Sequence, residues 1–303
     1  MERAPDRILP AIGLRLTSVA LFAAMNALIK LSELNGATLG EILFFRQFGA
    51  AMLVGTVVLI GPGWRSVATT RMPAHLLRAA MGLTAMAFTF AAILALPLAE
   101  ATTLGFTMPI FATILGALIL RESTGWHRWA AVITGFAGVL IVAQPGSGHF
   151  PLWGAMCGLM AAMLTASVSI LLRQIARTEA AMTTVFWFST LSLVPLGLVY
   201  AFAAQPHVPY VWMLLIGVGL FGGAAQLAMT SALGLGPVSV VVPMDYSSII
   251  WATLYGWLLF GVLPATSTWL GAPIIITAGL YIVWREHVRG RAKIVSSSLI
   301  MSE

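Results

Sequence analysis

Two charged residues lie in parts of the sequence that are otherwise apolar. Arg46 and Asp245 each stand near the middle of a long hydrophobic run. Burying a charge among apolar groups is costly, so such residues usually face the protein interior and take part in function. An arginine can hold a carboxylate through two hydrogen bonds, and an aspartate can bind an ammonium group or a proton. The two residues therefore predict a site for a small molecule that carries both charges, as an amino acid does. A buried Arg46–Asp245 ion pair that only joins two helices is the alternative.

Other candidate binding residues lie equally deep in apolar runs. Aromatic rings and one amide could line a cavity there: Phe106, Phe111, Trp187, Tyr246, Trp251 and Asn26. Prolines free backbone carbonyls and permit bending, which a gating helix can use. Four of them stand near these residues: Pro97, Pro109, Pro237 and Pro243. Packing of the rings and interhelical hydrogen bonding by the amide are the alternatives.

The composition is that of a membrane protein. Apolar residues make up 59% of the chain and charged residues 9%, whereas a soluble domain carries about 25% charged residues. The net charge of +6 does not indicate nucleic acid, because the basic residues are spread along the chain without interleaved aromatics. Cys157 is the only cysteine, so neither an intrachain disulfide nor a thiolate metal site is expected. No cofactor or metal is predicted.

Ten segments are apolar and long enough to cross the roughly 30 Å of hydrocarbon in a bilayer. When these spans alternate in direction, every lysine and arginine except Lys30 and Arg46 falls on the side of the two chain ends. The positive-inside rule then predicts that both ends are cytoplasmic. The expected spans are 11–31, 38–60, 74–95, 99–120, 126–143, 152–172, 180–203, 211–233, 238–260 and 266–284.

A few polar features within the spans have simple interpretations. Lys30 lies near an outer end, where it either extends to water or lines the substrate path. Glu41 and Glu100 stand in the first turn of helices, where the helix dipole favours an acid. The GxGxxG pattern at 217–222 lies inside a span and follows no soluble strand, so close helix packing is expected rather than nucleotide binding.

The chain contains an internal repeat. Segment 97–122 recurs as segment 237–262, with Pro97 aligned to Pro237 and Phe106 to Tyr246. Farther out, Phe44–Phe45 falls on Phe186–Trp187. Five spans in each half is an odd number, so the second half must enter the membrane from the opposite side. This predicts an inverted repeat around a central site, with two mirror-related states that open to opposite sides.

Three stretches carry a family resemblance. FFRQFGAAMLV, PLAEATTLGFTMPIFATILGALILRE and GFAGVLIV resemble the first EamA-type module of the drug/metabolite transporter superfamily, and 236–283 is similar to the second module. The resemblance implies ten helices, a cavity lined mainly by the first four of each half, and export of amino acids or related small metabolites. The fifth helix of each half is then peripheral, where a homodimer contact could form. Such modules often carry an acid after the core helix, but Val262 stands opposite Glu122, so a gate of two such acids is not expected.

We therefore expect an all-α integral membrane protein of ten transmembrane helices. Residues 1–147 form the first five-helix repeat, 148–287 the inverted second repeat, and 288–303 a disordered cytoplasmic tail. The expected function is not enzymatic. It is export of amino acids and related metabolites across the inner membrane by alternating access, with either proton coupling through Asp245 or facilitated diffusion. Uptake or exchange of a cationic or nucleoside-bearing metabolite is the alternative.

Overall fold

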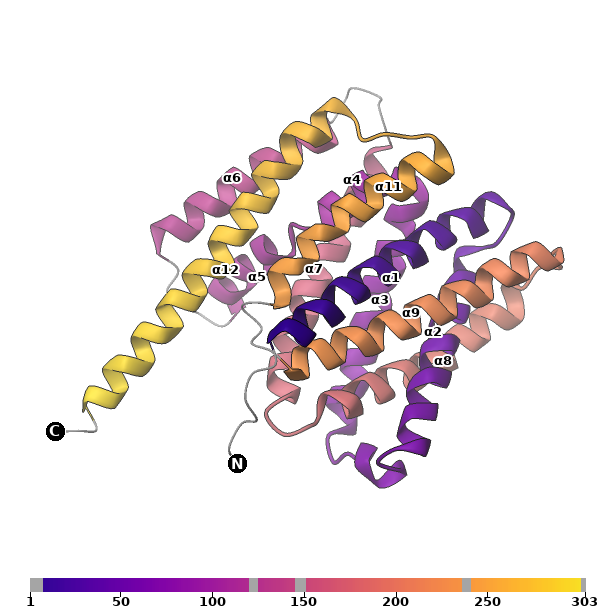
Figure 1. Ribbon diagram of the computed structural model, residues 1–303, viewed down its shortest axis with the longest axis horizontal. Helices are drawn as coiled ribbons and strands as arrows, with labels where there is room; N and C mark the ends of the chain where they lie inside the picture. The colour runs from indigo at the N-terminus through magenta and orange to yellow at the C-terminus, as the bar shows by residue number, and fades with distance from the viewer. Residues whose placement is uncertain (1–7, 120–124, 145–150, 236–240, 301–303) are drawn as a thin grey trace.

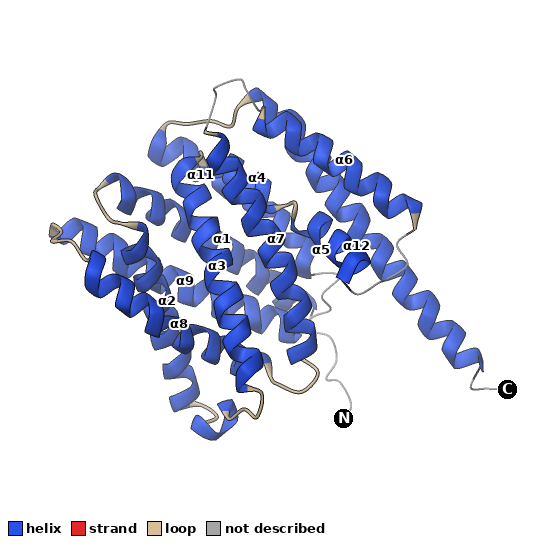
Figure 2. Cartoon of the chain, turned by 180° about the vertical axis from the view of Figure 1, so that it is seen from behind, coloured by secondary structure: helices blue, strands red, loops and turns tan. Residues whose placement is uncertain are grey.

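The protein is a bundle of long helices (Figures 1 and 2). The computed structural model describes residues 8–119, 125–144, 151–235 and 241–300, and every regular element in these ranges is helical. The first half contains α1 (Ile8–Leu34), α2 (Leu39–Ile60), the short η1 (Trp64–Val67), α3 (Met72–Ala95), α4 (Leu98–Gly105), α5 (Met108–Ile119) and α6 (Trp126–Ala143). The second half contains α7 (Leu152–Ile175), α8 (Ala181–Ala203), α9 (Pro209–Leu235), η2 (Val242–Ser247), α11 (Ser248–Phe260) and α12 (Thr266–Ile300).

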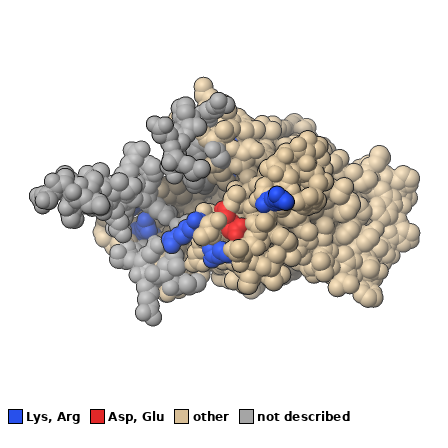
Figure 3. Space-filling model, turned by 90° about the horizontal axis from the view of Figure 1, so that it is seen from below, with Lys and Arg blue, Asp and Glu red and all other residues tan. Residues whose placement is uncertain are grey.

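Eight of the ten expected membrane spans each correspond to one helix, and the span expected over 99–120 is divided between α4 and α5. Within the described ranges, nine segments are long and apolar enough to cross a bilayer. The remaining span is the one expected over 238–260, whose first residues lie outside the described ranges. Its described part consists of η2 and the 13-residue α11. The all-helical fold with membrane-length helices is confirmed, while the orientation with both ends inside stays a prediction. Figure 3 shows one face of the molecule, on which acidic and basic side chains lie close together near the middle.

The two repeated core helices are both interrupted, at equivalent positions. In the first half the chain turns at Phe106 and Thr107, between α4 and α5. The Thr107 hydroxyl donates to the Leu104 carbonyl at 2.6 Å, which competes with continuation of the helix. In the second half the hydroxyl of Ser247, which aligns with Thr107, donates to the Met244 carbonyl at 2.6 Å, where η2 gives way to α11. Both copies of the repeat therefore contain a helix break at the same aligned position.

The two halves run in opposite directions. Equivalent helices α2 and α8 lie antiparallel, because a Cβ on Gly40 would meet Val199 while the Gln47 amide donates to the Phe188 carbonyl at 3.3 Å. Helices α6 and α12 are also antiparallel, with Gly138 against Ile275 and Gly135 against Ala278. Equivalent elements of a parallel repeat could not pack in this way. The predicted inverted repeat is confirmed.

Three polar side chains, two of them buried, bind the connections between helices at one end of the bundle. Glu41 is fully buried; it caps α2 through Thr38 and accepts hydrogen bonds from the Gln205 backbone and the His207 ring, both at 2.9 Å. Glu100 accepts from the Ala265 backbone at 3.0 Å and from Thr268 at 2.9 Å, at the start of α12. The Lys30 ammonium donates to two carbonyls where α3 ends, those of Ile93 and Leu96. All three side chains therefore have local structural roles.

Helices α6 and α12 lie together at one edge of the bundle (Figure 1). Their outer face exposes apolar side chains, among them Ile133, Leu140 and Leu270. A homodimer contact on this face stays a prediction. Helix α12 continues to Ile300, through the segment that the sequence analysis expected to be disordered from residue 288. That segment contains no proline to end the helix.

Glycines allow α2 and α9 to approach closely. A Cβ added to Gly49 would overlap the backbone of Gly219, and one added to Gly223 would meet the backbone of Ala50 at 3.2 Å. Gly219 and Gly222 belong to the GxGxxG pattern, and Gly222 packs against Met25 and Arg46. The expected packing role of this pattern is confirmed.

The helix contact yields a prediction with an internal control. Gly49→Ala should lower the free energy of unfolding by about 1–3 kcal/mol, because the added methyl group forces α2 and α9 apart. Gly55→Ala, on the same helix, should leave stability unchanged or slightly higher, since nothing lies within 4 Å of its Cβ position. Thermal unfolding of the purified protein in detergent measures both. Equal stability of the two variants would contradict this packing.

Candidate functional site

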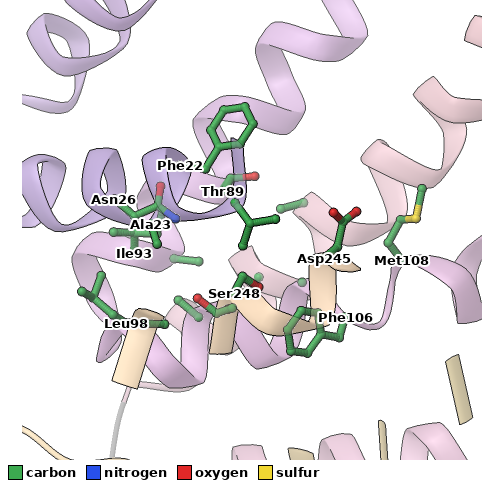
Figure 4. A pocket seen from close by; sticks show the side chains of 18 of the residues that line it. Phe22, Ala23, Asn26, Thr89, Ile93, Leu98, Phe106, Met108, Asp245 and Ser248 are labelled. Atoms are coloured by element: carbon green, nitrogen blue, oxygen red, sulfur yellow. The ribbon is translucent and has the colours of Figure 1, made fainter. Parts of the chain in front are cut away.

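A cavity of about 410 Å³ lies beside the two interrupted core helices. This volume falls within the range of about 300–1,000 Å³ that is typical of pockets for small molecules. Figure 4 shows Phe22 and Asn26 from α1, Thr89 from α3, Phe106 from the break in the first half and Ser248 from the break in the second. Both halves of the repeat thus contribute to the lining. Interrupted helices at corresponding positions of two inverted repeats are where transporters bind their cargo.

Apolar packing borders one end of the cavity. Ile93, Leu98 and Ala252 line the cavity and also belong to the largest buried apolar cluster. This cluster joins both halves through fully buried side chains such as Ile42 and Leu215. The other end carries Asp245 and Met108, which Figure 4 shows across the cavity from Leu98.

An ion pair stands at the second end. The Arg15 guanidinium donates from Nε to Asp245 Oδ1 at 2.5 Å and from Nη2 to Oδ2, so the contact is bidentate. Arg15 is on α1 and Asp245 on η2, and the pair therefore ties the first half to the second. The Arg15 side chain is 10% exposed and that of Asp245 is 38% exposed, so the carboxylate remains accessible from the cavity.

Sequence analysis identified Asp245 but not its partner. Arg15 is one of the basic residues that the sequence analysis places on the side of the chain ends, although it lies inside the span expected over 11–31. That position was the signal that could have found it. The structure pairs Asp245 with Arg15, so the alternative of an Arg46–Asp245 pair is wrong.

Arg46 lies in a different part of the bundle. Its guanidinium donates to Gln47 and, at 3.3 Å, to Gln226 of α9. It is not among the residues that line the cavity, because its side of α2 faces α9 rather than α4 and α11. A role for Arg46 in binding cargo stays a prediction.

Two aromatic residues that the repeat aligns meet each other. The rings of Phe106 and Tyr246 are 4.9 Å apart between centroids, and Phe106 lines the cavity. Because the two positions are equivalent, the pseudo-two-fold axis passes near this contact. The Tyr246 hydroxyl is buried where a Cβ on Gly279 of α12 would lie, and it has no hydrogen-bond partner among the described residues.

The remaining predicted residues have the following places. Phe111 packs edge-on against Phe136, with centroids 5.7 Å apart, and Trp251 stacks with Tyr255. The Trp187 indole donates to the Val67 carbonyl at 2.8 Å. None of Phe111, Trp187 and Trp251 is among the lining residues.

The predicted hinge prolines border the cavity elements. Pro97 precedes α4, Pro109 stands in the first turn of α5, and Pro243 lies in η2. Pro237 lies outside the described residues. Gating by these prolines stays a prediction.

Comparison with known proteins agrees with the two-repeat architecture. The EamA-like transporter family matches the chain twice, over residues 9–144 and 152–285. A riboflavin transporter of Vibrio cholerae is 30% identical over 91% of this chain and 93% of its own length. The pseudopaline exporter CntI of Pseudomonas aeruginosa is 28% identical, covering 85% and 90%. An S-adenosylmethionine uptake transporter of Rickettsia bellii is 26% identical, covering 81% and 84%.

The ion pair predicts a non-additive pattern of stability. Arg15→Gln and Asp245→Asn should each lower the free energy of unfolding by about 1–3 kcal/mol, because each leaves a partly buried charge alone. The double variant should be more stable than the sum of the two losses implies. Thermal unfolding in detergent measures the cycle, with Arg65→Gln as the control for loss of an exposed arginine. Strict additivity would show that the two side chains do not interact.

Proposed function

This chain belongs to the EamA-like transporter family, and on that premise we propose that it is a secondary transporter whose cargo binds in the cavity beside Arg15 and Asp245. The observation that carries the proposal is the position of the cavity. It lies at the breaks of both core helices, and residues of both halves line it. The expected setting is the cytoplasmic membrane.

The lining favours a cargo that has a ring system and several hydroxyl groups. Phe22 and Phe106 offer aromatic faces, while Asn26, Thr89 and Ser248 offer hydrogen bonds. The Asn26 amide has no hydrogen-bond partner among the described residues, so it is free to bind a cargo. Arg15 and Asp245 neutralise each other, which suits an uncharged molecule. Riboflavin, which the Vibrio cholerae relative is named for, has this chemistry. We propose riboflavin or a similar ring-bearing polyol as the cargo.

An amino acid is the second candidate. The carboxylate of the amino acid would bind Arg15 in place of Asp245. Its ammonium group would bind Asp245 in place of Arg15. The accessible carboxylate of the pair, with 38% of the Asp245 side chain exposed, favours this exchange. Cargo entry would then open the link between α1 and η2.

Alternating access follows from the inverted repeat. The apolar cluster that contains Ile93 and Leu98 borders one end of the cavity, which supports a closed gate there. Exchange of the two halves' conformations would close the end near Asp245 and open the other. The direction of net transport is open to test, since relatives include both an exporter and an uptake transporter.

Counterflow in proteoliposomes tests the proposal. Liposomes loaded with unlabelled riboflavin should accumulate labelled riboflavin transiently from outside, and empty liposomes should not. The same assay with a panel of amino acids tests the second candidate. Arg15→Gln should abolish amino-acid exchange and only slow riboflavin exchange. Absence of counterflow for both cargo classes would refute the proposal, provided that the protein is folded and inserted.

A cavity-filling variant tests where the cargo passes. Ala161 lines the cavity on α7 and is 6% exposed. Ala161→Leu should reduce counterflow at least ten-fold, because the larger side chain occupies the cargo volume. Ala130→Leu, at an exposed position of α6, adds the same atoms away from the cavity and should transport normally. Equal loss in both variants, or none in Ala161→Leu, would place the pathway elsewhere.

A further inference from the structure

Two arginines lie together in the wall of the bundle, separate from the cavity. Arg46 of α2 is 7% exposed, and its Nε is buried without a hydrogen-bond partner. Arg78 of α3 also has buried and unpartnered Nε and Nη1 atoms. Gln47, which accepts a hydrogen bond from Arg46, donates to the Phe188 carbonyl, and the Arg78 guanidinium lies over the ring of the same Phe188. Two like charges thus share one interior region.

No carboxylate among the described residues pairs with either arginine. Glu179 contacts α3 elsewhere: it accepts a hydrogen bond from Thr69 at 2.7 Å and lies 3.8 Å from the His75 ring. Arg46 instead donates to two neutral amides, those of Gln47 and Gln226. Amide oxygens supply partial charge only, so the positive charge of the pair is not balanced.

The surroundings supply further donors and an aromatic face. The Arg78 guanidinium lies 4.2 Å from the centroid of the Phe188 ring on α8. On α8, Ser189 follows Phe188 and Ser192 lies one helical turn after it, and the buried hydroxyls of both serines have no partner among the described residues. A cation–π contact offsets part of the cost of burying one arginine but leaves its N–H groups unused. The polar groups left without a partner, which are arginine N–H groups and serine hydroxyls, can all donate hydrogen bonds.

The fold does not require a charge at this place. Phe188 is the residue of the second half that aligns with Arg46, since Phe44–Phe45 aligns with Phe186–Trp187. An apolar ring therefore fills the same position on α8. A buried arginine pair that the helix packing does not need indicates a ligand of opposite charge.

We propose that Arg46 and Arg78 form a binding site for a small anion in the wall made by α2, α3, α8 and α9. The ligand is a monovalent anion of the size of chloride, or a single carboxylate group. Bidentate guanidinium contacts and serine hydroxyls suit both. The site does not depend on the identity of the cargo in the central cavity.

Thermal unfolding in different salts tests the site. The purified full chain is unfolded in sodium methanesulfonate, and part of this salt is replaced at constant ionic strength by chloride in one series and by acetate in the other. A bound anion should raise the unfolding midpoint saturably, by about 5 °C at a hundred times its Kd. The rise should disappear in Arg46→Gln and in Arg78→Gln and persist in Arg65→Gln, which removes an exposed arginine.

The two salt series separate the two sources of the ligand. A response to chloride supports a free halide, and a response to acetate supports a carboxylate group. An unchanged midpoint of the unmodified protein in both salts would overturn the proposal, as would equal responses in Arg46→Gln, Arg78→Gln and Arg65→Gln. The titration of the unmodified protein decides the question even if one arginine variant does not fold.

Discussion

Charged groups inside a membrane protein must find their partners within the protein, and this constraint organises the bundle. Arg15 and Asp245 satisfy it with a bidentate contact between α1 and η2. The contact joins the two halves at one end of the cavity, while an apolar cluster joins them at the other. The two kinds of closure differ in how a cargo can affect them. A polar cargo can compete for an ion pair, whereas apolar packing yields only to movement of the helices.

The cavity lies between two copies of a core helix, each of which is interrupted. At each break a hydroxyl donates to the carbonyl three residues earlier, from Thr107 in the turn after α4 and from Ser247 at the end of η2. When the two copies meet in opposite orientations, both breaks come to the same level, and Phe106 contacts Tyr246. The freed backbone borders a cavity between the halves, which is where irregular backbone is tolerated inside a membrane.

The halves are equivalent in backbone but not in charge. Arg46 of α2 aligns with Phe188 of α8, and the two residues lie in one helix wall together with Arg78. Asp245 has no acidic counterpart in the first half, where Gly105 aligns with it. Inverted repeats tolerate such divergence because helix packing depends on volume and on small residues, such as Gly49 and Gly219 where α2 meets α9. Charged residues in a single half can therefore supply functions that the symmetric fold does not need.

Hydropathy and the internal repeat were sufficient to predict the helices, the inverted halves and the packing role of the glycines around Gly219. They also identified Asp245, since a lone acid in an apolar run must face the interior. Hydropathy and the repeat could not predict the partner of Asp245. Arg15 and Arg46 both lie within predicted spans, and sequence spacing does not reveal which helix faces η2. Only the tertiary structure decided this, by packing α1 beside η2 and turning Arg46 toward α9. Which arginine pairs with Asp245 depends on how side chains point between helices that are far apart in the sequence. A pattern along the sequence does not contain this information.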